Sequence, residues 1–176
     1  MKKQFMKKKP LRLITEAALI AALYVALTLI FAPISFGAAQ VRIAEALSIL
    51  PMFTASAVPG LFIGCLIGNL LGGGVILDVV FGSIATLIGA AGGLLLRKNR
   101  WLVPIPAVLA NTLIVPFVLR YGYGVAIPIP LLMLYILAGE AVGAYLLGEL
   151  LGSALIRNRK RIFGDGGKEE AEESRS

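Results

Sequence analysis

Apolar runs recur along this chain at a length and frequency that the interior of a soluble domain could not hold. The first, over residues 11–32, is long enough to cross a bilayer, which takes about 20 mostly apolar residues in a helix. Of the 176 residues, 58% are apolar, and the mean hydropathy is +0.87. A soluble fold of this size could not hide so much apolar surface from water. The bilayer is therefore the expected solvent.

Five further apolar segments follow the first, and we expect all six to be helices of one membrane domain over residues 11–157. The expected bounds of the five are 42–57, 58–73, 78–96, 101–119 and 130–156. The second and third segments are short for a crossing, so one long kinked span, with five crossings in all, is the alternative. The basic tail 1–10 resembles the charged region of a signal peptide, but the apolar run after it is too long for one.

Basic residues gather at three points along the chain, and their positions favour six crossings over five. These residues are Lys2, Lys3, Lys7, Lys8, Lys9 and Arg12, then Arg97, Lys98 and Arg100, then Arg157, Arg159, Lys160 and Arg161. Cytoplasmic flanks collect Lys and Arg, and six crossings put all three clusters on one side. We therefore expect an all-α integral membrane protein of six transmembrane helices with both termini in the cytoplasm, in the cell membrane.

The same placement of charge argues against a nucleic-acid partner, because the net charge of +7 is explained by topology. The charged tail 158–176 is expected to be disordered. With one cysteine, Cys65, and no histidine, the chain has no internal disulfide and no multi-thiolate or His-ligated metal site. No GxxxxGK[ST] motif occurs, so any ATP that drives this protein must bind another subunit. We expect no enzyme activity and no cofactor.

Polar side chains within the expected helices favour the outer half of the bilayer or its midplane. An ionisable group at that depth costs at least about 2.5–3.5 kcal/mol, so it should face a cavity or a partner. Glu140, about 15 Å inside its helix, is the deepest acid. The pattern predicts a substrate pocket open to the outside, with these candidate residues: Gln40, Arg42, Glu45, Asn69, Asp78, Asn111, Glu140 and Tyr135.

Structural roles are open for most of these candidates. Arg42 and Glu45 are spaced i,i+3 and can pair with each other. Asp78 can cap the helix that it begins. Asn69 and Asn111 can form hydrogen bonds between helices. Glycines at helical spacing are expected to serve packing within the bundle: Gly60, Gly64 and Gly68 in one row, and Gly139, Gly143 and Gly148 in another.

Several stretches resemble a known transporter group. The segment ALIAAL, from Ala18 to Leu23, resembles the AxxxA segment of substrate-binding S components of energy-coupling factor (ECF) transporters. The stretches FAPISFGAAQVRIAEAL (31–47), PGLFIGCLIGN (59–69) and LDVVFGS (77–83) are similar to the QueT family of that group, the queuosine precursor transporters. The resemblance covers residues 14–156, and these long strings are far more specific than AxxxA.

The resemblance implies an S component, in which six helices surround a pocket sealed by outer loops. Its partners would be a transmembrane coupling subunit, met through Ala18 and Ala22, and two ATPase subunits. The implied substrate is a 7-deazaguanine such as prequeuosine. Carboxylates would accept its N–H groups, amides would serve its carbonyl, and rings such as Tyr135, Phe36 or Tyr121 would stack on it.

Two other functions fit the same residues. An S component for another vitamin or nucleobase could use the same pocket with other pairings. A stand-alone secondary carrier is a second alternative, although such carriers have related halves and no clear internal repeat is visible here.

Overall fold

The structure is a computed structural model that describes residues 10–36 and 40–158, and within these residues every regular element is a helix. The long helices are α1 (Pro10–Ile30), α3 (Ala57–Leu71), α4 (Ser83–Leu95), α5 (Ile105–Tyr121), α6 (Ile129–Glu140) and α7 (Gly148–Arg157). The short elements are α2 (Ala32–Ser35), η2 (Ile43–Met52), η3 (Asp78–Gly82), η4 (Arg100–Leu102) and η5 (Ala141–Leu147). Nearly all of the two expected tails lies outside the described residues.

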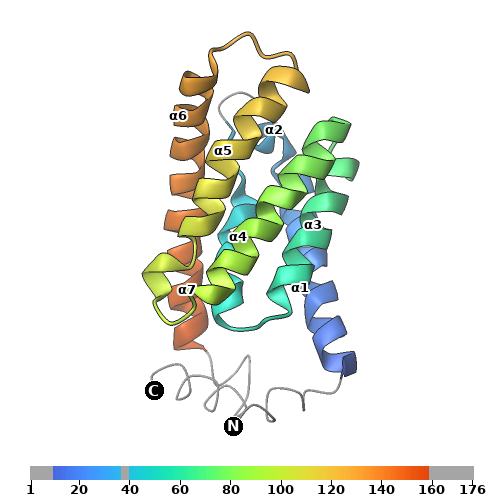
Figure 1. Cartoon of the computed structure of the whole chain (residues 1–176). Helices are drawn as coiled ribbons and strands as arrows, with labels where there is room; N and C mark the ends of the chain where they lie inside the picture. Colours follow the sequence, from blue (N-terminus) through green and yellow to red (C-terminus); the bar gives the residue numbers. More distant parts are fainter. Residues whose placement is uncertain (1–9, 37–39, 159–176) are drawn as a thin grey trace.

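Four helical stretches in the described residues are long and apolar enough to cross a membrane. They are Leu11–Ile30, Asp78–Leu95, Arg100–Tyr121 and Ile129–Arg157, while Ile43–Met52 and Ala57–Leu71 are shorter. The chain passes back and forth along the bundle, so that α1 begins and α7 ends at the same end (Figure 1). An all-helical membrane bundle is therefore established, whereas six crossings and the sides of the termini stay predictions.

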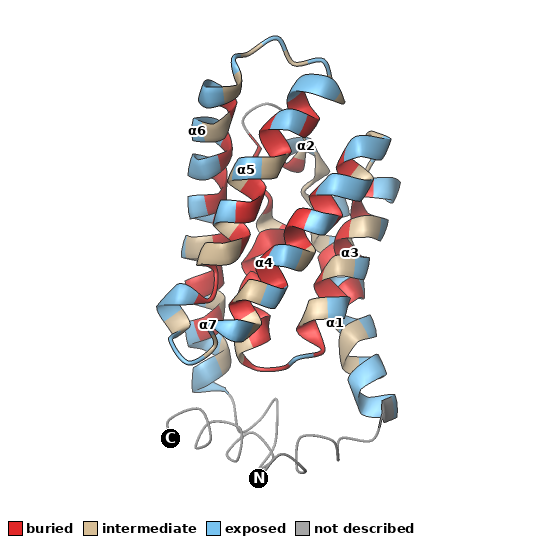
Figure 2. Cartoon of the chain, viewed as in Figure 1, coloured by how far each residue is buried: buried red, intermediate tan, exposed pale blue. Residues whose placement is uncertain are grey.

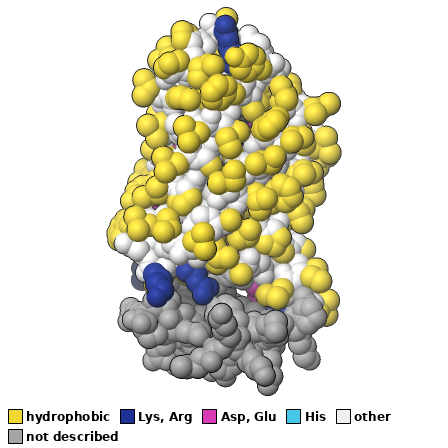
Figure 3. All heavy atoms as spheres, viewed as in Figure 1, with side chains coloured by type: hydrophobic (Ala, Val, Ile, Leu, Met, Phe, Trp, Pro, Cys, Tyr) yellow, Lys and Arg dark blue, Asp and Glu magenta, His cyan; other side chains and the backbone are white. Residues whose placement is uncertain are grey.

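The outer surface of the bundle is apolar. Exposed side chains lie on the outward faces of α4, α5 and α6, and buried ones lie between the helices (Figure 2). On the face drawn in Figure 3, hydrophobic side chains cover the sides, and Lys and Arg lie near the two ends. Because helices satisfy their own backbone groups, such a surface is stable in hydrocarbon but not in water.

The second apolar segment differs from the α-helix expected over residues 42–57. It forms a 3₁₀ helix, η2, and a turn then leads into α3 at Ala57. Residues 44–51 are all buried, because η2 lies against α1, α3, α4, η5 and α7. A 3₁₀ helix rises about 2.0 Å per residue against 1.5 Å in an α-helix, so ten residues extend about 20 Å rather than 15 Å. The tighter helix carries a short segment deeper into the bundle.

Glycines allow the close approaches in both predicted rows, except at Gly148, where a Cβ would make an ordinary contact. Gly60, Gly64 and Gly68 of α3 lie against α1, where a Cβ on Gly64 would be 2.7 Å from the Cβ of Tyr24. A Cβ on Gly143 would be 2.6 Å from the backbone oxygen of Arg42, and one on Gly139 would overlap the backbone of Gln40. Small residues on α3 thus hold α1, and small residues on α6 and η5 hold the segment that leads into η2.

The α1–α3 contact should tolerate no added atom at Gly64. We expect Gly64→Ala to lower the unfolding free energy by about 1–3 kcal/mol, because the methyl group would overlap Tyr24 and Ala21. Gly148→Ala is the matched control, since its nearest neighbour would be 3.4 Å away and alanine favours a helix. Thermal unfolding of the detergent-purified variants measures both. Equal melting temperatures for the two would contradict this account of the packing.

Candidate substrate site

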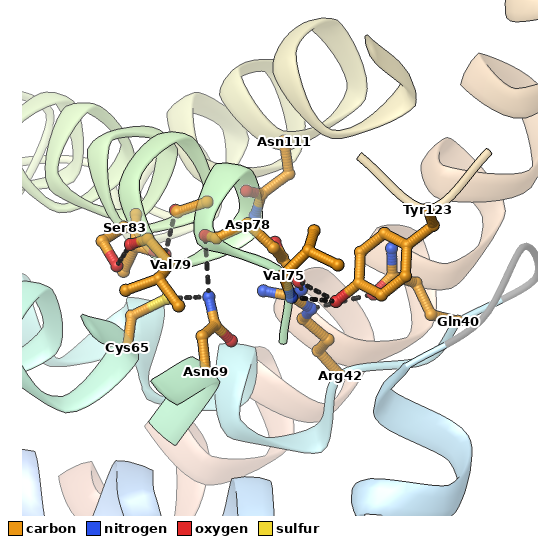
Figure 4. A network of polar contacts seen from close by, with 12 residues as sticks. Gln40, Arg42, Cys65, Asn69, Val75, Asp78, Val79, Ser83, Asn111 and Tyr123 are labelled. Carbon is orange, nitrogen blue, oxygen red and sulfur yellow. Dashed lines mark hydrogen bonds and ion pairs between the residues drawn. The ribbon is translucent and has the colours of Figure 1, made fainter. Parts of the chain in front are cut away.

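A buried ion pair lies where the chain enters η2. The Arg42 Nη2 atom donates to Asp78 Oδ1 at 3.1 Å and to Oδ2 at 2.9 Å (Figure 4). Arg42 Nε donates to Gln40 Oε1 at 2.9 Å, and the guanidinium carbon lies 5.7 Å from the centre of the Phe36 ring. Only 7% of the Arg42 side chain and 2% of the Asp78 side chain are exposed. Both charges are therefore withdrawn from solvent and matched to each other.

Two more residues complete this outer cluster, which comprises Gln40, Arg42, Asn69, Asp78 and Tyr123. The Tyr123 hydroxyl donates to Asp78 Oδ2 at 3.0 Å and accepts from the Val75 backbone N–H at 3.3 Å. Asn69 Nδ2 donates to the backbone oxygen of Asp78 at 3.1 Å. Burial, together with the charge of Asp78, raises the pKa of Tyr123 to about 12. Tyr123 therefore stays protonated at neutral pH and acts as a donor to Asp78.

A second acid, Glu45, lies on η2 one 3₁₀ turn beyond Arg42. Its Oε1 atom accepts from the Tyr24 hydroxyl of α1 and, at 3.3 Å, from the Thr86 hydroxyl of α4. Glu45 and Tyr24 are each 1% exposed. In a 3₁₀ helix residues three apart eclipse one another, so Glu45 and Ser48 align along η2.

The third acid, Glu140, pairs with an amide across α5 and α6. Asn111 Nδ2 donates to Glu140 Oε1 at 3.1 Å. Glu140 Oε2 and Asn111 Oδ1 are buried and accept no hydrogen bond from the described residues. The buried hydroxyls of Ser48 and Thr112 also have no partner there. Buried polar atoms normally find partners, so two open acceptors on one side-chain pair indicate a place for a donor.

Departures from α-helical geometry occur at all three acids. Glu45 lies in the 3₁₀ helix η2, Asp78 begins the π-helix η3, and Glu140 directly precedes the π-helix η5. Short π turns within α-helices often occur at functional sites, since the added residue changes which way the neighbouring side chains point. The bundle thus departs from regular helices where its buried charges lie.

Most of the predicted site residues lie in these groups. Gln40, Arg42, Asn69 and Asp78 meet in the outer cluster, and Glu45, Asn111 and Glu140 lie further from it. Tyr135 differs, since it is 38% exposed on α6 and no described hydrogen bond joins it to the others. Ala18 and Ala22 lie on the exposed face of α1.

The open structural roles are resolved in part. Arg42 pairs with Asp78 and not with Glu45, and Asp78 makes no capping hydrogen bond to its own helix. Asn69 and Asn111 do form hydrogen bonds between elements. Glu149, which is not among the candidates, is 6% exposed and paired with Arg100.

Sequence reasoning missed Tyr24 and Thr86, the two hydroxyl donors to Glu45. We call the group formed by Glu45, Tyr24, Thr86, Asn111 and Glu140 the inner site. A tyrosine in the middle of an apolar span can indicate a polar partner nearby, because a buried phenol hydroxyl usually forms a hydrogen bond. A threonine gives no such signal, since its hydroxyl can bond within its own helix, as Thr86 also does to Gly82. Tyr123 was also absent from the candidates, and its bond to Asp78 joins it to the outer cluster.

An all-helical bundle with an apolar outside and polar groups gathered inside is the architecture of an integral membrane protein. Residues 14–157 match the family model described as QueT transporter, and this chain belongs to that family. It is also 37% identical over 93 residues to the Queuosine precursor transporter QueT of Lactococcus lactis subsp. cremoris (strain MG1363). That match covers 52% of this chain and 54% of the relative, so it spans about half of each. No solved structure matches the chain.

The outer cluster should stabilise the fold more than it binds solute, because both Asp78 oxygens already accept hydrogen bonds. We expect Asp78→Asn to cost about 3–5 kcal/mol of stability, since it leaves Arg42 buried without its counter-charge. Tyr123→Phe removes one donor and should lower the melting temperature less. Arg120→Gln is an exposed control. If Asp78→Asn melts with the wild type, the pair has no such role.

Proposed function

We propose that this chain is the substrate-binding S component of an ECF-type, ATP-driven importer, and that its solute is a 7-deazaguanine queuosine precursor. The observation that carries the proposal is the pair of open acceptors, Glu140 Oε2 and Asn111 Oδ1, buried inside the bundle. The name of the Lactococcus relative, a queuosine precursor transporter, supports this solute class. The membership of the chain in the QueT transporter family supports transport.

The chemistry of these acceptors suits such a solute. A guanine-type edge presents a ring N–H beside an exocyclic amino group, so it donates two neighbouring hydrogen bonds. Glu140 Oε2 and Asn111 Oδ1 are two acceptors on side chains that are already bonded to each other. An unpaired buried polar atom costs about 1–3 kcal/mol, and a solute that donates to both would recover that cost. The pair of side chains is therefore suited to a donor-rich ligand.

Glu140 should contribute strongly to binding. We expect Glu140→Gln to weaken binding of both the aminomethyl compound prequeuosine and its nitrile relative by about 10- to 100-fold, because the edge that they share loses a charged acceptor. Isothermal titration calorimetry of the detergent-purified protein measures the affinities. Glu149→Gln is the control, since Glu149 is equally buried, 6% exposed, but is paired with Arg100. Unchanged affinity for both compounds would remove Glu140 from the site.

The outer face of α1 is where we place the coupling subunit. Ala18 and Ala22 are exposed there, and an apolar groove of about 510 Å³ opens beside Ala18 between α1 and the start of α3. Its other lining residues include Ala17, Ala21, Ala55 and Pro59. Small side chains allow a second helix to approach closely in a membrane. A transmembrane helix of the coupling subunit is the proposed occupant, and two ATPase subunits on that partner would supply the energy.

A bulky side chain on this face should separate uptake from binding. Ala22→Trp should abolish uptake, since Trp would hold the coupling helix away, and should leave solute affinity of the isolated protein within about twofold of the wild type. Leu23→Trp is the control, because Leu23 is 48% exposed and lies about 100° around α1 from Ala22. Uptake by whole cells and calorimetry measure the two properties. Loss of binding in Ala22→Trp would place this face inside the bundle and exclude the docking surface.

We propose that both chain ends lie in the cytoplasm. The connection that holds Arg97, Lys98 and Arg100 is at the same end of the bundle as the start of α1 and the end of α7 (Figure 1). Cysteines that replace Lys3 or Arg159, in a Cys65→Ser background, should resist a membrane-impermeant maleimide on intact cells and react after permeabilisation. Labelling at either position before permeabilisation would reverse the orientation.

A further inference from the structure

The charges buried around the site do not balance. Three acids lie there, Glu45, Asp78 and Glu140, and each is at most 6% exposed. Arg42 is the one fully buried cation among the described residues, and Asp78 takes two of its hydrogen bonds. Arg42 and Glu45 lie near enough to Glu140 for their charges to interact with it. Acidic side chains thus outnumber the buried cation three to one, which favours a ligand that brings a positive charge.

Glu45 and Glu140 differ in what holds them. Glu140 accepts from a neutral amide and leaves its free oxygen near the free oxygen of Asn111, which suits a two-donor edge. Glu45 accepts from two hydroxyl groups, Tyr24 and Thr86, on a single oxygen, Oε1. Neither of these hydrogen bonds uses Oε2, so that oxygen of Glu45 is the one available to a donor on a ligand.

Tyr24 has little freedom to move away from Glu45. Its side chain is 1% exposed, and α3 approaches it at Gly64, where a single added methyl group would overlap the Tyr24 Cβ. The second donor, Thr86, reaches Glu45 from α4. Two helices therefore fix one oxygen of Glu45 and thereby the direction in which the other points.

We propose that Glu45 receives the cationic aminomethyl group of the solute while Glu140 and Asn111 receive its guanine-type edge, and that Tyr24 is a positioning residue for this charge recognition. The inference rests on the proposed function and assigns each part of the solute to one acid. A 7-deazaguanine carries its 7-substituent on the five-membered ring, away from the donor edge of the six-membered ring. Two separate acids can thus hold the two ends of one ligand.

The test compares two ligands that share the edge but differ in charge, the 7-aminomethyl and the 7-cyano 7-deazaguanines. Tyr24→Phe removes one oxygen atom, and we expect affinity for the amine to fall about tenfold, at least fivefold more than affinity for the nitrile. Glu45→Gln should reduce the preference for the amine further. Thr28→Val is the matched control on the same face of α1, since the Thr28 hydroxyl bonds only to the Tyr24 backbone oxygen. It should leave the ratio of the two affinities unchanged.

The outcomes separate the two proposals. If the wild type binds neither ligand by calorimetry, the proposed function is wrong. If the wild type binds but Tyr24→Phe weakens both ligands equally, the inference is wrong and Tyr24 only packs the bundle. Thr86→Val removes the other donor to Glu45, so it decides the question if Tyr24→Phe does not fold. A selective loss for the amine in either variant supports the assignment of Glu45.

Discussion

The ion pair between Arg42 and Asp78 determines how one end of this bundle is assembled. Neither charge is stable alone at that depth, so the segment before η2 and the start of η3 must lie together. Gln40, Asn69 and Tyr123 then attach further segments to the same two residues. Because Arg42 directly precedes η2, the pair also sets the depth at which Glu45 enters the bundle.

The inner site depends on helices that are not α-helices. Successive residues of an α-helix are 100° apart, so Glu45 and Ser48 would lie about 60° apart around one. On η2 they share a face, and Glu45 is held between Tyr24 and Thr86. Glu140 precedes a π-helical segment that lies against η2. The geometry of these helices thus decides which polar side chains meet in the inner site.

The sequence predicted the apolar helices and, with the exception of Gly148, the packing role of the glycine rows, because each depends on local composition. It did not predict that Arg42 would choose Asp78 over Glu45, since the nearer acid in sequence was an equally good partner by spacing alone. The 3₁₀ form of η2 was also missed, because residues 42–57 have the apolar content of any helix. The burial of η2 is provided by the neighbouring helices, which the sequence of the segment does not specify.

The complete enclosure of η2 bears on how the chain is made. A ten-residue helix with a buried carboxylate is too short and too polar to enter hydrocarbon as an independent span. Its enclosing wall includes η5 and α7, which are synthesised last. Before η5 and α7 pack against it, η2 remains partly exposed to lipid. Insertion of the long helices must therefore precede the final seating of η2, and the interior forms only once the last helix has been delivered.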